Sequence, residues 1–234
     1  GTGKTYLAEC IAGEAGIPTV IMKNFRDKWV GTSEGNLEKI FRLLQALDRC
    51  VVFIDEADQT LGARNASGDS GLSGRLYSMI AQEMSKGENR GRILWVLASS
   101  RPDLIEVDLK RPGRIDTKIP ILPTSSKEES MGLLRILLKR NELQLSDEEE
   151  KELIPLAPPM LTPGSAEAIA AKVFRDVHSG ELEVAPVLRK FLENYHPPVP
   201  MHLIEQQIRL AVNEATDMEL IPEFYHKYKE NLNT

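Results

Sequence analysis

The sequence predicts an α/β fold, a parallel sheet flanked by helices, followed by a small all-helical lid domain. Up to about Leu122, helical patterns alternate with short apolar runs rich in β-branched residues, which is typical of a parallel sheet. After Pro123 the strand-like runs stop and helical patterns continue. We place the boundary in the LPTSS stretch, so that residues 1–124 form the α/β domain and residues 125–234 the helical domain with a C-terminal helical extension.

The elements of the first half follow from local periodicity. Helices are expected at residues 4–15, 36–47 and 72–85. In the second of these, one face carries Leu37, Ile40, Phe41, Leu44 and Leu47, as a helix packed on a sheet requires. The expected strands are the runs PTVIM, CVVFID, ILWVLAS and TKIPIL, the last at residues 117–122.

The second half carries helix-start signals. Ser126 with Glu129, and Ser146 with Glu149, have the spacing of a capping box, in which a serine and a glutamate satisfy the first backbone N–H groups of a helix. Three further helices are expected at residues 165–178, 186–195 and 201–217.

Composition narrows the class of protein and its partners. The chain has 234 residues, 41% of them hydrophobic and 27% charged, values ordinary for a soluble globular protein, and no apolar run long enough to cross a membrane. The net charge of −6 argues against a surface built for nucleic acid and favours protein partners. Cys10 and Cys50 are expected to pack as small hydrophobic residues, which fits a reducing, cytoplasmic compartment.

The first five residues, GTGKT, resemble the end of a phosphate-binding P-loop. Gly3 would let backbone N–H groups close on phosphate, Lys4 would reach the β- and γ-phosphates, and Thr5 would offer a hydroxyl to Mg²⁺. A chance glycine-rich turn before a helix is the alternative. The central strand that precedes a P-loop would lie before Gly1, so we expect the chain to be part of a longer polypeptide. The nucleotide-binding residues predicted here are Gly1, Thr2, Gly3, Lys4, Thr5 and Tyr6.

A second motif is the run CVVFIDEAD, an apolar strand that ends in two carboxylates about fifty residues after GKT. Asp55 is placed to hold Mg²⁺, and Glu56 to orient and polarise the water that attacks the γ-phosphate. A solvated strand end would also explain two acids at this position.

Together these motifs resemble the AAA subfamily of AAA+ ATPases, the hexameric protein-remodelling motors with a P-loop NTPase fold. The resemblance covers nearly the whole chain and is carried by GTGKT, KWVGTSEGNLEKIF, VVFIDEAD, LASSRPDLIEVDLKRPGRID and PGSAEAIAAK. It implies that Arg111 and Arg114 are arginine fingers that reach the γ-phosphate in a neighbouring subunit. A surface loop with its arginines held by Asp108 and Asp116 remains the alternative.

The resemblance also implies a pore loop, and it contains two departures from the family pattern. Lys28, Trp29 and Val30 correspond to a pore loop that grips an extended polypeptide, although Trp29 could instead pack against the protein. Ser100 replaces the asparagine that places the attacking water, so we expect slower hydrolysis. Ser165 and Ala166 stand where relatives carry a glycine and an alanine that contact the nucleotide, and Ser165 could simply cap its helix.

The function predicted by the resemblance is an ATP- and Mg²⁺-dependent motor, a homo-oligomer and a hexamer, that remodels, unfolds or translocates a protein substrate or one bound to an adaptor. Two alternatives stay open. One is a scaffold held together by ATP with incidental hydrolysis. The other is a P-loop kinase or small GTPase, which leaves RPGRID and the helical domain unexplained.

Overall fold

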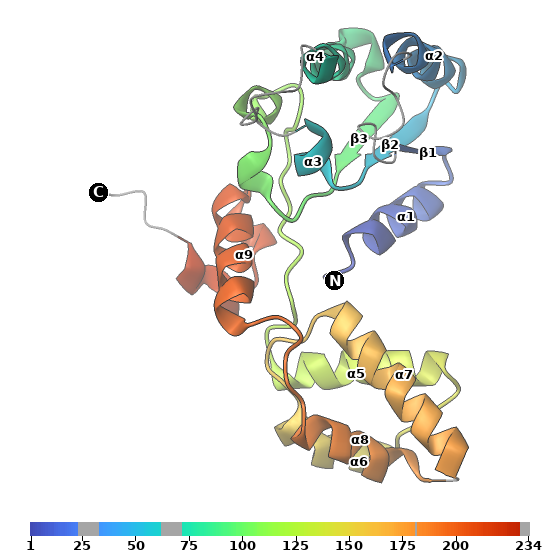
Figure 1. Cartoon of the computed structure of the whole chain (residues 1–234), viewed down its shortest axis with the longest axis vertical. Helices are drawn as coiled ribbons and strands as arrows, with labels where there is room; N and C mark the ends of the chain where they lie inside the picture. The colour runs from blue at the N-terminus through green and yellow to red at the C-terminus, as the bar shows by residue number, and fades with distance from the viewer. Residues whose placement is uncertain (23–32, 62–71, 181, 230–234) are drawn as a thin grey trace. The chain divides into compact units, whose positions relative to one another are not determined.

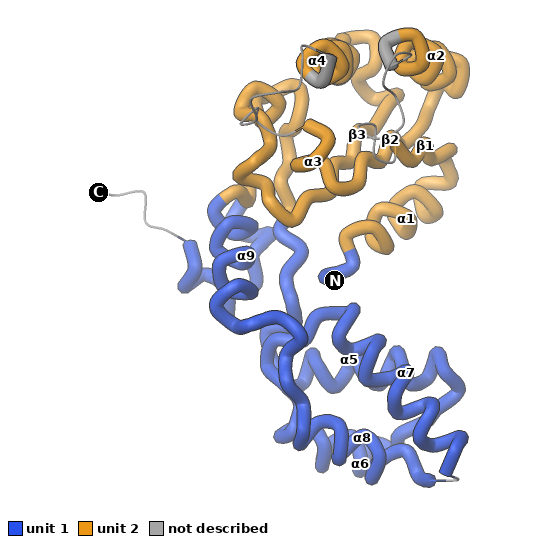
Figure 2. The backbone as a smooth tube through the Cα atoms, in the orientation of Figure 1, with its two compact units in different colours: residues 1–3, 120–213, 217–234 blue, residues 4–119, 214–216 orange. Residues whose placement is uncertain are grey.

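The computed structural model describes residues 1–22, 33–61, 72–180 and 182–229. Within these ranges the chain forms two compact units, coloured separately in Figure 2. One unit comprises residues 4–119 with 214–216, and the other comprises residues 1–3, 120–213 and 217–234. We call them the sheet unit and the helical unit.

The sheet unit contains three parallel strands, β1 (Thr19–Met22), β2 (Cys50–Ile54) and β3 (Ile93–Leu97), in the order β1-β2-β3. Val52 pairs with Val20 on one side and with Trp95 on the other. Every residue of β2 is buried, as expected for a central strand covered on each face.

Helices cover the two faces of this sheet (Figure 1). The helices α2 (Ser33–Ala46) and α4 (Leu72–Ser85) pack on one face, where Leu44 and Ile80 meet Val52 and Ile54 in the larger core. The helix α1 (Lys4–Ala15) packs on the other face, where Ala8 contacts Phe53. The five apolar residues predicted to share one helix face all lie in or against the larger core, and the last of them, Leu47, directly follows the end of α2.

The remaining elements of the sheet unit are short. They are α3 (Ala57–Leu61), η1 (Gly87–Asn89), η2 (Pro102–Leu104) and η3 (Val107–Lys110).

The helical unit packs α5 (Lys127–Arg140), α6 (Asp147–Leu153), α7 (Pro163–Gly180) and α8 (Val184–Glu193) around one apolar core. The predicted capping box is complete at Ser146 and Glu149. At α5, Ser126 caps the helix, but the Glu129 carboxylate accepts from the N–H and hydroxyl of Ser125 instead.

The end of the chain adds α9 (Met201–Glu214), η5 (Met218–Leu220) and η6 (Glu223–Tyr228), and η4 (Ile154–Leu156) follows α6. Tyr225 of η6 is fully buried, and its hydroxyl donates to the carbonyls of Pro123 and Thr124 at 3.1 and 2.9 Å. Burial raises the pKa of Tyr225, so the phenol stays protonated and remains a donor.

Two predictions about local structure are wrong. Residues 117–122 form no strand, because a strand needs a neighbouring ladder and the backbone of Lys118 instead binds Thr216, donating to its hydroxyl and accepting from its N–H. Cys10 is exposed rather than packed, because α1 buries only Ala8 and Ala12 on the sheet. Cys50 is buried as predicted, at the start of β2.

Candidate functional site

The carboxyl end of the sheet gathers the first group of predicted site residues. Parallel strands present the residues that follow them at one edge, and this edge carries Asp55 after β2 and Ser100 shortly after β3. The start of α1 lies at the same place. The Thr5 hydroxyl donates to the Asp55 carboxylate at 2.8 Å, and the Lys4 ammonium donates to the Ser100 hydroxyl at 3.3 Å.

This group has the donor chemistry that a magnesium-bound triphosphate requires. A hydroxyl and a carboxylate in contact offer hard oxygen ligands suited to Mg²⁺, and Lys4 adds a positive charge for phosphate. The first turn of α1 contains no acidic residue, so its N-terminal end keeps the partial positive charge that favours an anion.

Glu56 occupies a strained turn at this edge. Its φ of 47° lies in the left-handed region, which non-glycine residues adopt at a cost of about 1–3 kcal/mol. Asp55 accepts from the Glu56 N–H at 2.9 Å, and the following N–H of Ala57 donates to Ala98 at 2.9 Å. The turn thus joins β2 to α3 while leaving Glu56 exposed, and the strain is sustained by bonds on each side of it.

The loop after β3 is held by its own hydrogen bonds. Ser99 bonds to Asp58 and accepts from the Arg101 N–H, while Arg101 and Asp103 form a two-pronged ion pair. The Arg101 guanidinium lowers the pKa of Asp103, which keeps that carboxylate charged. Ser100 is left exposed between these anchored residues, with Lys4 as its partner.

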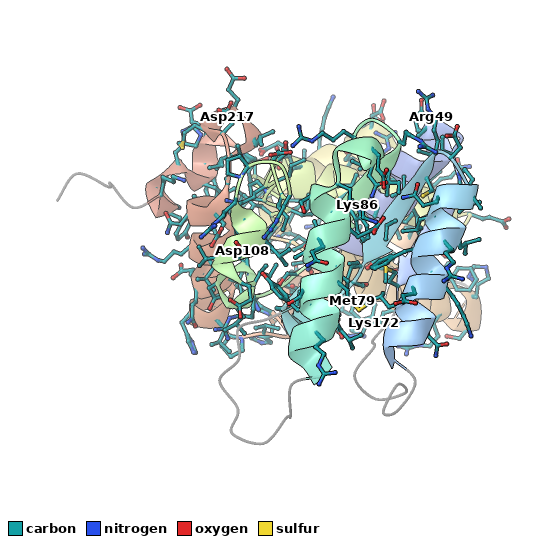
Figure 3. The ribbon with its side chains drawn as sticks, turned by 90° about the horizontal axis from the view of Figure 1, so that it is seen from above. Arg49, Met79, Lys86, Asp108, Lys172 and Asp217 are labelled. Carbon is teal, nitrogen blue, oxygen red and sulfur yellow. The ribbon has the colours of Figure 1, made fainter. Side chains whose placement is uncertain are left out.

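Arg111 and Arg114 form a second group with Asp108, which Figure 3 labels. The Asp108 carboxylate lies 3.3 Å from the Arg111 guanidinium and also pairs with Arg114. Arg114 donates in addition to the Asp108 carbonyl at 3.0 Å. The side chain of Arg111 is 72% exposed and that of Arg114 is 23% exposed. In the single chain, therefore, Asp108 holds the two arginines, as the alternative interpretation expected, whereas Asp116 accepts from the Gly113 N–H instead.

The charges of this arginine group and its partners affect the pKa of Tyr77, a partly buried residue of α4. Its hydroxyl is buried and has no hydrogen-bond partner among the described residues. Burial is the main cause that raises the Tyr77 pKa, and the negative charges of Asp108 and Glu106 raise it further, whereas the positive charges of Arg114 and Arg111 lower it. The phenol therefore remains neutral beside the ion pairs.

The third group lies in the helical unit, which contains Gly1–Gly3 as well as the start of α7. The Gly164 N–H donates to the Gly1 carbonyl at 2.9 Å, and a Cβ added at Gly164 would come within 3.3 Å of that oxygen. This close contact joins Gly164 to the backbone of Gly1, whereas the contact that the sequence put in doubt is the approach of Ser165 to the nucleotide. Thr162 caps α7 by accepting from the Ser165 N–H at 3.2 Å, and Ala166 is fully buried.

The predicted residues of the pore segment, Lys28, Trp29 and Val30, lie outside the residues that the structure describes. Sequence analysis also passed over Gly164 as a contact residue, and it offered Asp108 and Asp116 together as partners of the two arginines. A Pro-Gly pair at the start of α7 was the available signal for Gly164, whereas only the folded loop selects Asp108 rather than Asp116 for Arg111 and Arg114.

The fold and this site define a class of protein, the P-loop NTPases with an adjoining helical domain. Residues 1–122 match the model of the ATPase family associated with various cellular activities (AAA). The chain belongs to this AAA family.

Relatives with curated descriptions agree with this assignment. The chain is 36% identical over 129 residues to a cell division cycle protein 48 homolog of Archaeoglobus fulgidus, covering 54% of this chain and 18% of the relative. It is 30% identical over 174 residues to the peroxisomal ATPase PEX6 of Dictyostelium discoideum, covering 73% of this chain and 14% of the relative. It is 31% identical over 166 residues to the ATP-dependent zinc metalloprotease FtsH of Myxococcus xanthus, covering 69% of this chain and 26% of the relative. The chain thus spans about a quarter or less of each of these relatives.

Among the described residues, no helix is long and apolar enough to cross a membrane.

Proposed function

We propose that the protein hydrolyses ATP with Mg²⁺ and uses the energy to remodel, unfold or translocate protein substrates as a hexameric ring of identical subunits. The observation that carries this proposal is the cluster at the sheet edge, where Lys4, Thr5, Asp55 and Ser100 are joined by hydrogen bonds beside the strained Glu56. The relatives named as ATPases support it.

The residues divide the work as follows. Thr5 and Asp55 would hold Mg²⁺, which would neutralise charge on the phosphates, and Lys4 would bind the phosphates directly. Glu56 would orient the attacking water and accept its proton. Ser165 and Ala166, with Gly1, Thr2, Gly3 and Tyr6, would line the nucleotide, and Lys28, Trp29 and Val30 would contact the substrate polypeptide.

Arg111 and Arg114 would act on the nucleotide of a neighbouring subunit. Arg111 has the exposure that this role needs, because within the described residues a single ion pair at 3.3 Å holds it and most of its side chain is in solvent. Exposed ion pairs contribute about 0–1 kcal/mol, so exchange of Asp108 for a phosphate is not opposed by a large loss.

The test is ATP turnover per subunit of the full-length protein over a range of protein concentrations. A motor whose active sites span two chains will show turnover that rises as subunits assemble and then levels off. Turnover that stays negligible in assembled rings that bind ATP would contradict the motor. It would favour the scaffold, in which Asp108 keeps the arginines within their own chain.

Ser100 supplies a second expected result. We expect Ser100→Asn to raise the turnover number several-fold with little change in ATP affinity, because the longer amide reaches further toward the attacking water than a hydroxyl does. Steady-state kinetics with a parallel ATP-binding titration will measure the two effects. A Ser100→Asn protein that hydrolyses ATP no faster than the parent protein would count against a water-placing role at this position.

A further inference from the structure

The arginine loop, residues 109–118, is anchored by a short segment far along the chain. Glu214, Ala215 and Thr216 belong by their contacts to the sheet unit, while the residues on each side of them belong to the helical unit. Two of these residues, Glu214 and Thr216, contact the loop at both of its ends, immediately before Arg111 and shortly after Arg114.

At the first end, Glu214 pairs with Lys110, the residue that precedes Arg111. The side chains of Lys110 and Glu214 are only 15% and 26% exposed. Shielding of this kind reduces screening by water and salt, so the pair holds its geometry better than an exposed pair does.

At the second end, Thr216 forms two hydrogen bonds with the backbone of Lys118. The Lys118 N–H donates to the Thr216 hydroxyl at 2.7 Å, and the Thr216 N–H donates to the Lys118 carbonyl at 3.1 Å. The Lys118 ammonium also lies 3.9 Å from the second carboxylate oxygen of Glu214, so one carboxylate spans Lys110 and Lys118.

Hydrogen bonds within the arginine loop link its two halves. The Ile115 N–H donates to the Leu109 carbonyl at 3.1 Å, and the Gly113 N–H donates to the Asp116 carboxylate at 2.6 Å. A shift of the anchored ends would therefore move Arg111 and Arg114 together.

Resting on the function proposed above, we propose that Glu214 and Thr216 are positioning residues for the arginine loop. They set the place from which Arg111 and Arg114 reach the nucleotide of the neighbouring subunit, and thereby give the C-terminal segment control over hydrolysis in the next chain. Neither residue touches the nucleotide or the reacting atoms in this scheme.

The defining variant is Glu214→Gln in the full-length protein, since it keeps the shape of the side chain and removes the charge that pairs with Lys110. We expect turnover to fall about 10- to 100-fold, the range that a 1 Å displacement of a catalytic group can produce. ATP affinity should remain unchanged. The double variant Lys110→Glu with Glu214→Lys restores the pair and should recover part of the lost turnover.

Asp48→Asn is the matched control. Asp48 forms a 2.7 Å ion pair with Arg92 in the same unit, and asparagine tolerates its φ of 63°. This change should leave turnover unaltered.

A mixing experiment then locates the defect. Glu56→Gln subunits would hydrolyse ATP far more slowly but would keep their arginines. Adding them to Glu214→Gln subunits therefore supplies an intact arginine loop to sites that keep Glu56. Turnover of the mixture well above that of Glu214→Gln alone supports the proposal. A mixture that shows no such gain places the defect in the variant's own nucleotide site or fold and overturns it.

The outcomes also separate the inference from the function on which it rests. Glu214→Gln with parental turnover refutes the positioning role while leaving the motor intact. A parent protein with no turnover in assembled rings removes the motor and the positioning role together.

Discussion

Replacing Arg111 by alanine is expected to reduce ATP turnover by ~10³–10⁵-fold, the effect typical of an arginine that stabilises charge on the transferred phosphoryl group. ATP binding by the variant subunit should persist, because Lys4, Thr5 and Asp55 are untouched and the arginine serves a neighbouring site. Rapid-quench measurement of a single turnover, together with an ATP-binding titration, will separate the two effects.

The structure makes Arg111 the sharper target of the two arginines. Arg114 donates to the carbonyl of Asp108 and pairs with its carboxylate, and only 23% of its side chain is exposed, so its removal also disturbs the loop. Arg111, which is 72% exposed, has one ion pair to lose. Loss of turnover in Arg114→Ala alone, with Arg111→Ala fully active, would reverse the roles proposed here.

Arg92→Ala is the control for Arg111→Ala. Arg92 is also an arginine of the sheet unit in an ion pair with an aspartate, and it precedes β3, at the sheet edge opposite Asp55. Its removal should cost little turnover. Equal losses in the two variants would indicate general destabilisation rather than transition-state stabilisation.

Replacing Glu56 by glutamine is expected to reduce turnover by ~10²–10⁴-fold, the usual contribution of a positioned general base. The amide cannot accept the proton of the attacking water, but it preserves the size of the side chain and the bonds of its backbone. ATP and Mg²⁺ should still bind, so the variant should accumulate in assembled, ATP-bound rings. Turnover measured beside bound nucleotide and molecular mass will check this.

Glu88→Gln is the control for Glu56→Gln, because Glu88 is an exposed glutamate of η1 that precedes a strand, β3, whereas Glu56 follows a strand, β2. A Glu56→Gln protein that hydrolyses ATP at the parental rate would show that another group activates the water. One that no longer binds ATP would show instead that Glu56 supports the phosphate site itself.

Much of the fold could be predicted because its signals are local. The periodicity at residues 4–15 and 72–85 matches α1 and α4 residue for residue. The apolar run before Asp55 becomes a strand buried on both faces, as a central parallel strand must be. The cap at Ser146 likewise needs only residues within one turn of each other.

The predictions of secondary structure and burial failed where contacts between distant residues determine the local structure. Residues 117–122 look like a strand, yet Thr216 takes the backbone bonds of Lys118. The same contact accounts for the end of α9 at Glu214, three residues before the predicted end, since the Thr216 N–H bonds to Lys118 rather than within the helix. Cys10 sits in an apolar sequence, but only one narrow face of α1 reaches the sheet.

The sequence by itself determined the class of chemistry, because GTGKT, DEAD and RPGRID carry their reactive groups at fixed local spacing. It also placed the carboxylates of Asp55 and Glu56 at the end of a strand, since the apolar run stops immediately before them. Tertiary structure alone decided that Lys4 meets Ser100, that Gly1 meets Gly164 and that Glu214 meets Lys110. It also selected Asp108 rather than Asp116 as the partner of the two arginines. These contacts either join residues far apart in the chain or depend on the conformation of a folded loop. The local sequence pattern therefore does not determine them.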